Sequence, residues 1–206
     1  MDYKPHLIYN KILTTQYITV GDDVQYYIET DKKNKRIYLI FQETKSKRDW
    51  QNNFNFASKL YKKQTSIMRV HRGFGNAWKS CNDEIMKNYI AECNLVKKYQ
   101  PTIIGWSYGG AITQLACEDF FYRTKQKCDV VTFGSPKIFG NNKSKMYVYS
   151  CCKSVTQYAD NNDIITYCVP YMKDLNTFYL GEKFSLRKIF NPHFYHKRYG
   201  DENLYQ

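Results

Sequence analysis

The segment that most constrains the fold of this chain is a serine flanked by glycines near the middle of the sequence. Residues 103–110 read Ile-Ile-Gly-Trp-Ser-Tyr-Gly-Gly, which places Ser107 in a Gly-x-Ser-x-Gly pattern. The apolar residues just before the pattern predict a short buried strand, and apolar residues spaced three or four apart after it predict a helix. A serine on such a strand-to-helix turn is typical of a nucleophile elbow, where only glycines fit beside the serine. A glycine-rich turn without chemistry is the alternative.

Strand and helix patterns alternate on both sides of this turn. Residues 76–99 carry apolar side chains at helical spacing and stop before Pro101, because the residue before a proline disfavours helix. Strand patterns cover residues 36–41, 67–70, 102–104, 129–133 and 155–159. The alternation predicts an α/β fold with a mostly parallel central sheet and helices on both faces. With 206 residues and no linker or repeat, we expect a single domain over 1–206.

A catalytic serine needs a base, and the base needs an acid that orients it. In a fold built on such an elbow these partners follow in the order Ser, Asp, His. Only His193 and His196 lie downstream of Ser107, so the base is one of these two residues. Asp163, in the polar turn after the strand at 155–159, is the preferred acid, and Asp160 is its nearby competitor. The alternative for Asp163 is an aspartate that only caps a turn.

Several blocks, in this order along the chain, resemble the class 3 (fungal-type) lipases of the α/β-hydrolase superfamily. The blocks are Val70–Phe74, Gly105–Ala111, Phe133–Lys137, Asn162–Ile165 and Val169–Pro170. The resemblance extends from about Ile37 to Tyr199 and implies hydrolysis of carboxylic esters in lipids, without a metal or an organic cofactor. It also implies that Asp163 takes the family's catalytic aspartate position.

The resemblance further implies an oxyanion hole with two donors. One is the backbone amide of Tyr108, at the positive end of the helix that follows Ser107. The other is Thr44, because Phe-Gln-Glu-Thr stands where the family has Phe-Arg-Gly-Ser/Thr. Glu43 in this block would disfavour developing negative charge unless it points away. That departure keeps open a lipase-like scaffold that has lost activity and serves as a binding protein.

The two candidate bases differ in their surroundings. His193 follows Pro192 and precedes a short aromatic stretch, which suits an exposed base at the start of a helix. His196 stands three residues before Tyr199 and matches the His-x-x-Tyr spacing of fungal members. We favour His193 as the base and keep His196 as the alternative.

Charge and cysteine content indicate which binding partners and which cellular compartment to expect. The formal net charge of +12 fits a solvated basic surface or peripheral contact with an anionic membrane, and no nucleic-acid motif supports a nucleic-acid partner. A basic nucleic-acid-binding protein remains the rival class. Seven cysteines in no disulfide framework, with no signal peptide or transmembrane stretch, predict a reducing intracellular setting. We expect a monomer that takes a lipid or a small ester as substrate.

Overall fold

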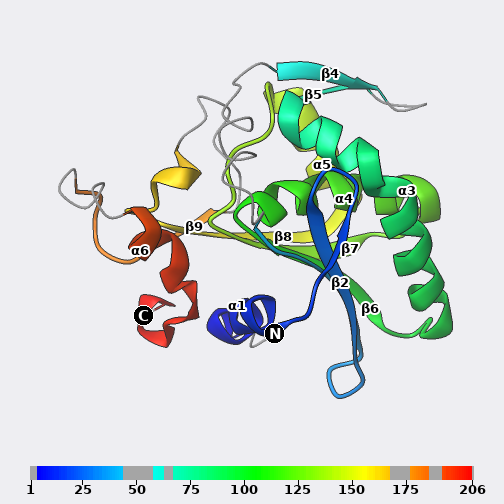
Figure 1. Ribbon diagram of the computed structural model, residues 1–206, viewed down its shortest axis with the longest axis horizontal. Coiled ribbons are helices and arrows are strands. Elements are labelled where there is room, and N and C mark those ends of the chain that lie inside the picture. Colours follow the sequence, from blue (N-terminus) through cyan, green and yellow to red (C-terminus); the bar gives the residue numbers. More distant parts are fainter. Residues whose placement is uncertain (1–3, 44–57, 63–66, 168–176, 186–191, 206) are drawn as a thin grey trace.

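Seven strands form one central sheet in the computed structural model of the chain, which describes residues 4–43, 58–62, 67–167, 177–185 and 192–205 (Figure 1). In sheet order they are β1 (Ile18–Val20), β2 (Val24–Asp31), β3 (Arg36–Phe41), β6 (Gln100–Trp106), β7 (Cys128–Phe133), β8 (Cys152–Asp160) and β9 (Thr177–Leu180). The first three strands pair antiparallel, and β3 through β9 pair parallel. The expected mostly parallel sheet is confirmed.

Helices cover both faces of this sheet (Figure 1). One face carries α3 (Arg72–Leu95), α4 (Tyr108–Thr124) and α5 (Asn142–Cys151). The other face carries α1 (Pro5–Thr14) and the 3-10 turns η3 (Arg198–Gly200) and η4 (Glu202–Tyr205), which follow α6 (Pro192–Lys197). A separate antiparallel pair joins β4 (Ser58–Lys62) to β5 (Ile67–His71), and η1 (Ile164–Thr166) follows β8. No helix among the described residues is long and apolar enough to cross a bilayer.

The β3 strand shows why a continuous apolar run forms the middle of the sheet. All six of its residues are buried. Leu39 and its odd-numbered neighbours pack into the core under α3 and α4, whereas Tyr38 and Ile40 pack into the core under α1. Successive side chains of a strand point to opposite faces, so a strand covered on both sides must be apolar throughout. The strand predicted over 36–41 is confirmed with the same bounds.

The helix predicted over 76–99 lies four residues nearer the amino terminus, and this prediction was wrong at both ends. The chain leaves α3 after Leu95 and makes a tight turn, in which the Tyr99 amide donates to the Val96 carbonyl at 2.8 Å. The next amide, that of Gln100, donates to the Lys35 carbonyl at 2.9 Å and so begins β6 beside β3. Pro101 therefore stands inside a strand and does not mark the helix end.

The start of α3 is fixed by a buried histidine. His71 is fully buried, and its Nδ1 accepts a hydrogen bond from the Gly73 amide at 3.2 Å, which caps the helix. Its ring also packs on Phe74, with 4.7 Å between ring centroids. Burial lowers the pKa of the His71 imidazole. His71 is thus part of the scaffold that holds α3.

This buried imidazole predicts a pH dependence of stability. Because the folded pKa lies below the unfolded value of about 6.5, the unfolded chain binds more protons as the pH falls past that value. The free energy of unfolding is therefore expected to be retained above about pH 6.5 and to decrease below it. Urea unfolding at about pH 5 and about pH 8 measures this, with His71→Asn as the comparison because asparagine keeps a capping oxygen. An equal pH dependence in both proteins would contradict the assignment.

Candidate active site

Ser107 occupies a strained turn between the end of β6 and the start of α4. Its backbone has φ 56° and ψ −123°, a conformation that residues other than glycine rarely adopt. The turn is held in place because the Ser107 amide donates to the Phe133 carbonyl of the neighbouring strand β7 at 2.9 Å. The geometry is that of a nucleophile elbow.

The glycines beside the serine are required by close backbone packing. A Cβ on Gly105 would lie 2.4 Å from the Gly109 carbonyl oxygen, and a Cβ on Gly109 would lie 2.5 Å from the Phe41 carbonyl oxygen. Both distances are too short for any side chain. The first turn of α4 therefore packs directly on the end of β3, where the segment bearing Glu43 begins.

The Ser107 side chain is enclosed by the elbow. The residue is 1% exposed, and among the described residues its Oγ has no hydrogen-bond partner. A buried hydroxyl without a partner costs free energy, which is typical of a group kept for chemistry. The amide of Tyr108, the first residue of α4, follows at once, so the helix N-terminus lies beside the hydroxyl.

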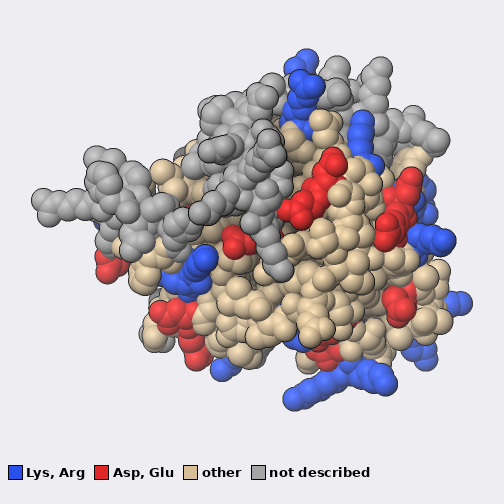
Figure 2. Space-filling view, viewed as in Figure 1, with Lys and Arg blue, Asp and Glu red and all other residues tan. Residues whose placement is uncertain are grey.

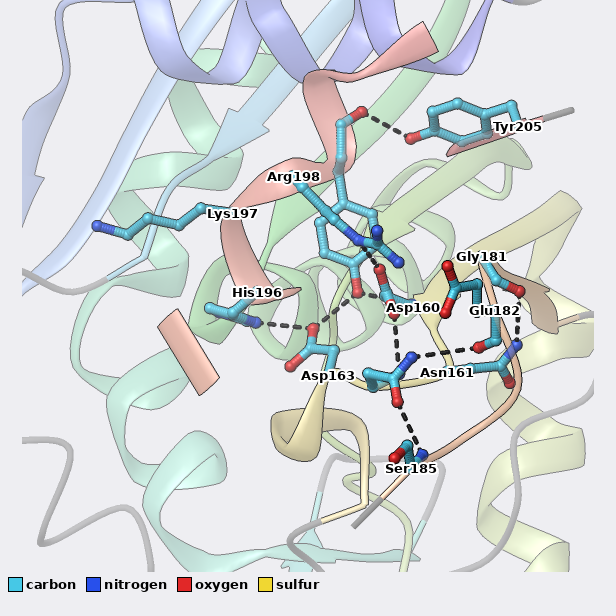
Figure 3. A network of polar contacts seen from close by, with 12 residues as sticks. Asp160, Asn161, Asp163, Gly181, Glu182, Ser185, His196, Lys197, Arg198 and Tyr205 are labelled. Carbon is cyan, nitrogen blue, oxygen red and sulfur yellow. Dashed lines mark hydrogen bonds and ion pairs between the residues drawn. The ribbon is translucent and has the colours of Figure 1, made fainter. Parts of the chain in front are cut away.

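Asp163 lies in the turn after β8 and is fully buried. Its Oδ1 accepts from the Ile165 amide at 3.1 Å, which caps η1 and fixes the carboxylate. Its Oδ2 lies 2.8 Å from Nδ1 of His196 (Figure 3). The same oxygen accepts a hydrogen bond from the Tyr199 hydroxyl at 2.7 Å. The carboxylate therefore caps a turn and also holds an imidazole, so the two interpretations of Asp163 are not exclusive.

His196 comes from α6 and is brought next to the elbow by Trp106. The Trp106 indole Nε1 donates to the His196 carbonyl at 3.0 Å, and the two rings pack with centroids 5.3 Å apart. Trp106 immediately precedes Ser107, so these contacts bring His196 to the neighbourhood of the elbow as well as onto Asp163. If His193 were the base, His196 would be expected at the surface. His196 is instead buried, with 3% of its surface exposed.

The structure thus groups four of the predicted site residues and leaves two undescribed. Ser107 and Tyr108 follow the end of β6, Asp163 follows the end of β8, and His196 packs on Asp163 and Trp106 at this same edge of the sheet. The side chain of His193 and the whole of Thr44 lie outside the described residues, as does most of the interval 49–68. Glu43 is described and half-buried. Burial, followed by the charges of Glu43 and Asp163, raises the pKa of the Tyr9 phenol on α1.

A second layer of polar contacts fixes the aspartate from behind (Figure 3). The Asp160 amide donates to the Tyr199 hydroxyl at 2.9 Å, so this hydroxyl links the two aspartates of the turn. The Asp160 carboxylate is buried and accepts from the Asn162 amide at 2.8 Å. It also forms an ion pair with the guanidinium of Arg198. Asp160, which was the other candidate for the catalytic acid, therefore pairs with an arginine and not with a histidine.

Three residues that shape the candidate site were given no role by sequence reasoning. Gly134 has φ 54°, and a Cβ there would lie 2.7 Å from Asp163 Oδ2 and 3.0 Å from His196 Cε1. The absence of a side chain at Gly134 therefore leaves room for Asp163 and His196 to pair. Trp106 and Tyr199 position His196 and Asp163. Gly134 and Trp106 fall inside two of the blocks named above, and Tyr199 completes the His-x-x-Tyr spacing, but the contacts of all three depend on the fold.

Comparison with known proteins shows similarity to lipases. The family model described as "Lipase (class 3)" matches residues 38–172. A lipase of Rhizomucor miehei is 24% identical over 164 residues, which is 78% of this chain and 44% of that lipase. A lipase of Rhizopus oryzae is 27% identical over 164 residues, which is 78% of this chain and 41% of that lipase.

Solved structures show the same fold. The native propeptide complex of Rhizomucor miehei lipase aligns with a TM-score of 0.68 and 21% identity, over 76% of this chain and 51% of that one. The lipase of Rhizopus microsporus var. chinensis aligns with a TM-score of 0.65 and 23% identity, over 75% of this chain and 55% of that one. This chain spans less than half the length of the curated relatives that it matches. Because the family model covers more than half of it, the chain belongs to the class 3 lipase family, with an α/β-hydrolase fold.

Proposed function

We propose that this protein is a serine esterase that hydrolyses carboxylic ester bonds of lipids through Ser107, His196 and Asp163. The observation that carries the proposal is the 2.8 Å contact between His196 Nδ1 and Asp163 Oδ2, beside a serine in an elbow conformation. Acyl transfer needs a nucleophile, a base that takes its proton and a buried acid that orients the base. We therefore replace His193 by His196 as the preferred base.

The proposed reaction proceeds in two steps. His196 removes the proton from Ser107 Oγ as that oxygen attacks the ester carbonyl, and the alcohol leaves with the proton from the imidazolium. Asp163 stabilises the imidazolium and holds its ring in position. Water, activated by the same histidine, then attacks the acyl-serine and releases the carboxylic acid. The chemistry needs no metal or organic cofactor.

The oxyanion of each tetrahedral intermediate would be bound by the Tyr108 amide and by Thr44. The amide has support from its place at the start of α4, whose dipole favours negative charge there. Thr44 remains a proposal from the family block alone. Each donor of this kind contributes on the order of 10²-fold in rate.

Acylglycerols and phospholipids are the substrates we propose to test first. One relative, 25% identical over 126 residues, is named a secreted mono- and diacylglycerol lipase A, from Penicillium cyclopium. The experiment measures fatty acid release from monoacylglycerol, triacylglycerol, phosphatidylcholine and a short-chain nitrophenyl ester. Release from at least one of them supports the proposal. Folded protein that releases acid from none of them would favour the alternative of a lipase-like binding protein.

We also propose a monomer that works in a reducing, intracellular compartment and contacts an anionic membrane peripherally. The six cysteines among the described residues are free thiols, and five of them are buried. Burial raises the pKa of the Cys81 thiol to about 12, which keeps it protonated and unreactive. Titration of free thiols in protein purified without reductant tests the setting, since bridged cysteines would contradict it.

Tyr199→Phe is expected to lower kcat for ester hydrolysis by about tenfold with little change in KM. The change removes the donor to Asp163 Oδ2 and the acceptor for the Asp160 amide, so the carboxylate that holds His196 loses one of its anchors. Because both partners are buried, the free energy of unfolding should also fall by about 1–3 kcal/mol. Steady-state kinetics and urea unfolding measure the two effects. An unchanged kcat would show that Tyr199 only fills space.

A further inference from the structure

Exposed lysines gather at the edge of the sheet that carries the amino-terminal ends of the parallel strands. They come from four turns, namely the one between β2 and β3 and those that lead into β6, β7 and β8. We call them the basic rim, which consists of Lys32, Lys33, Lys35, Lys97, Lys98, Lys125, Lys127 and Lys153. All of them are exposed. In Figure 2, blue side chains project from the lower edge, where Figure 1 places the turn after β2.

Backbone pairing makes these turns neighbours in space. The Gln100 amide donates to the Lys35 carbonyl at 2.9 Å, which joins the β2–β3 turn to the turn before β6. Lys153 Nζ donates to Gln100 Oε1 at 2.6 Å, which brings in the start of β8. The start of β7 lies against that of β8, because Cys128 pairs with Cys152. The basic rim is therefore one continuous edge.

Little negative charge opposes the basic rim. The two nearby arginines are already neutralised, since Arg36 pairs with Asp129 at 3.0 Å and Arg123 pairs with Asp119 at 2.8 Å. Within the described part of the chain, none of the eight rim lysines lies within ion-pair distance of a carboxylate. The Asp31 carboxylate at this edge accepts two hydrogen bonds from Asn34. The uncompensated charge here is carried by lysine ammonium groups.

A large apolar side chain stands among these lysines. Leu95, the last residue of α3, is 77% exposed, the highest value among the exposed large hydrophobic residues of the described chain. Lys97 and Lys98 follow it after Val96. An exposed apolar side chain close to lysines in the chain matches a membrane surface, where the ammonium groups meet lipid phosphates and the apolar group enters the headgroup boundary. A nucleic acid would use the ammonium groups but offers a leucine no comparable site.

We propose that the basic rim docks this protein onto an anionic phospholipid surface, with Leu95 inserted between the headgroups. The candidate active site lies at the other edge of the sheet, because β6 runs from Gln100 at the rim to Trp106 beside Ser107. Seven residues of strand separate the two edges by roughly 20 Å. The docked protein therefore holds its candidate site away from the membrane that binds it. The inference rests on the proposed peripheral membrane contact and specifies the face that makes it, but it does not depend on the proposed esterase activity.

The test is co-flotation with vesicles of phosphatidylcholine that contain phosphatidylserine, and with vesicles of phosphatidylcholine alone. We expect binding only to the first, at least tenfold weaker binding by Lys97→Glu/Lys98→Glu, and release by salt. The control variant is Lys87→Glu/Lys143→Glu, which changes the net charge equally at exposed positions away from the rim. Leu95→Ser should weaken binding several-fold with no change in charge, and Ser107→Ala should bind like the wild type.

Three outcomes would overturn the proposal. One is equal binding to both kinds of vesicle, or to neither. Another is the same loss of binding in the control variant, which would assign the effect to net charge alone. The third is a protein that does not bind phosphatidylserine vesicles but does bind a single-stranded RNA oligonucleotide, and whose RNA binding is weakened by Lys97→Glu/Lys98→Glu. Activity on a soluble nitrophenyl ester, if present, should be unchanged by saturating vesicles.

Discussion

His196→Ala is expected to lower kcat for ester hydrolysis by on the order of 10⁴-fold or more, whereas His193→Ala should keep most of the activity. His196 Nδ1 lies on the buried Asp163 carboxylate, and its ring packs on the residue that precedes Ser107. Without this imidazole the proposed triad has no base to take the serine proton. KM should change little, because the histidine acts on the transition state.

The matched pair of variants makes this prediction sharp. Both replace a histidine of α6 by alanine, so an effect of helix propensity or of net charge would appear in both. The readout is single-turnover hydrolysis of a short-chain nitrophenyl ester, with circular dichroism to show that each variant is folded. If His193→Ala loses the activity and His196→Ala keeps it, the proposed base is wrong.

Asp163→Asn is expected to lower kcat by on the order of 10⁴-fold while leaving the protein folded. The amide keeps an oxygen for the Ile165 amide, so the cap of η1 survives. It cannot stabilise an imidazolium, and it favours the wrong tautomer of His196. The loss should therefore be in kcat, with the free energy of unfolding changed far less than the barrier of the reaction.

Asp160→Asn provides the comparison, because Asp160 was the other candidate acid and lies in the same turn. Its carboxylate pairs with Arg198 and not with a histidine. We expect this variant to keep kcat within about tenfold and to lose about 1.5–3 kcal/mol of stability, because the Asp160 carboxylate is buried but the Arg198 guanidinium is partly exposed. Equal losses of kcat in the two variants would show that the turn, and not one carboxylate, supports the chemistry.

Much of the elbow could be predicted from sequence because its determinants are local. Gly105, Ser107 and Gly109 are adjacent in the chain, and the strand before them and the helix after them each have a clear periodicity. The β3 strand was equally clear, since it is buried on both faces and so is apolar at every position except its first. Asp163 followed from its position in a polar turn at the end of a strand.

The choice of histidine could not be made from local sequence. His193 and His196 are three residues apart on one short helix, and which of them reaches Asp163 depends on how α6 sits against Trp106. That placement depends in turn on α1, which the sequence analysis did not predict. Tyr9 of α1 packs edge-on against Trp106, with 5.5 Å between ring centroids, and against Tyr199 at 5.6 Å. Contacts between the amino-terminal and carboxyl-terminal segments thus determine which histidine reaches Asp163.

Reaction with a fluorophosphonate probe tests the central claim most directly, because the probe bonds only to a serine whose hydroxyl is activated by a base. Wild-type protein should be labelled at Ser107, as located by mass spectrometry of peptides, and labelling should be lost in Ser107→Ala and strongly slowed in His196→Ala. Folded wild-type protein that takes up no label, or label found on another residue, would contradict the account.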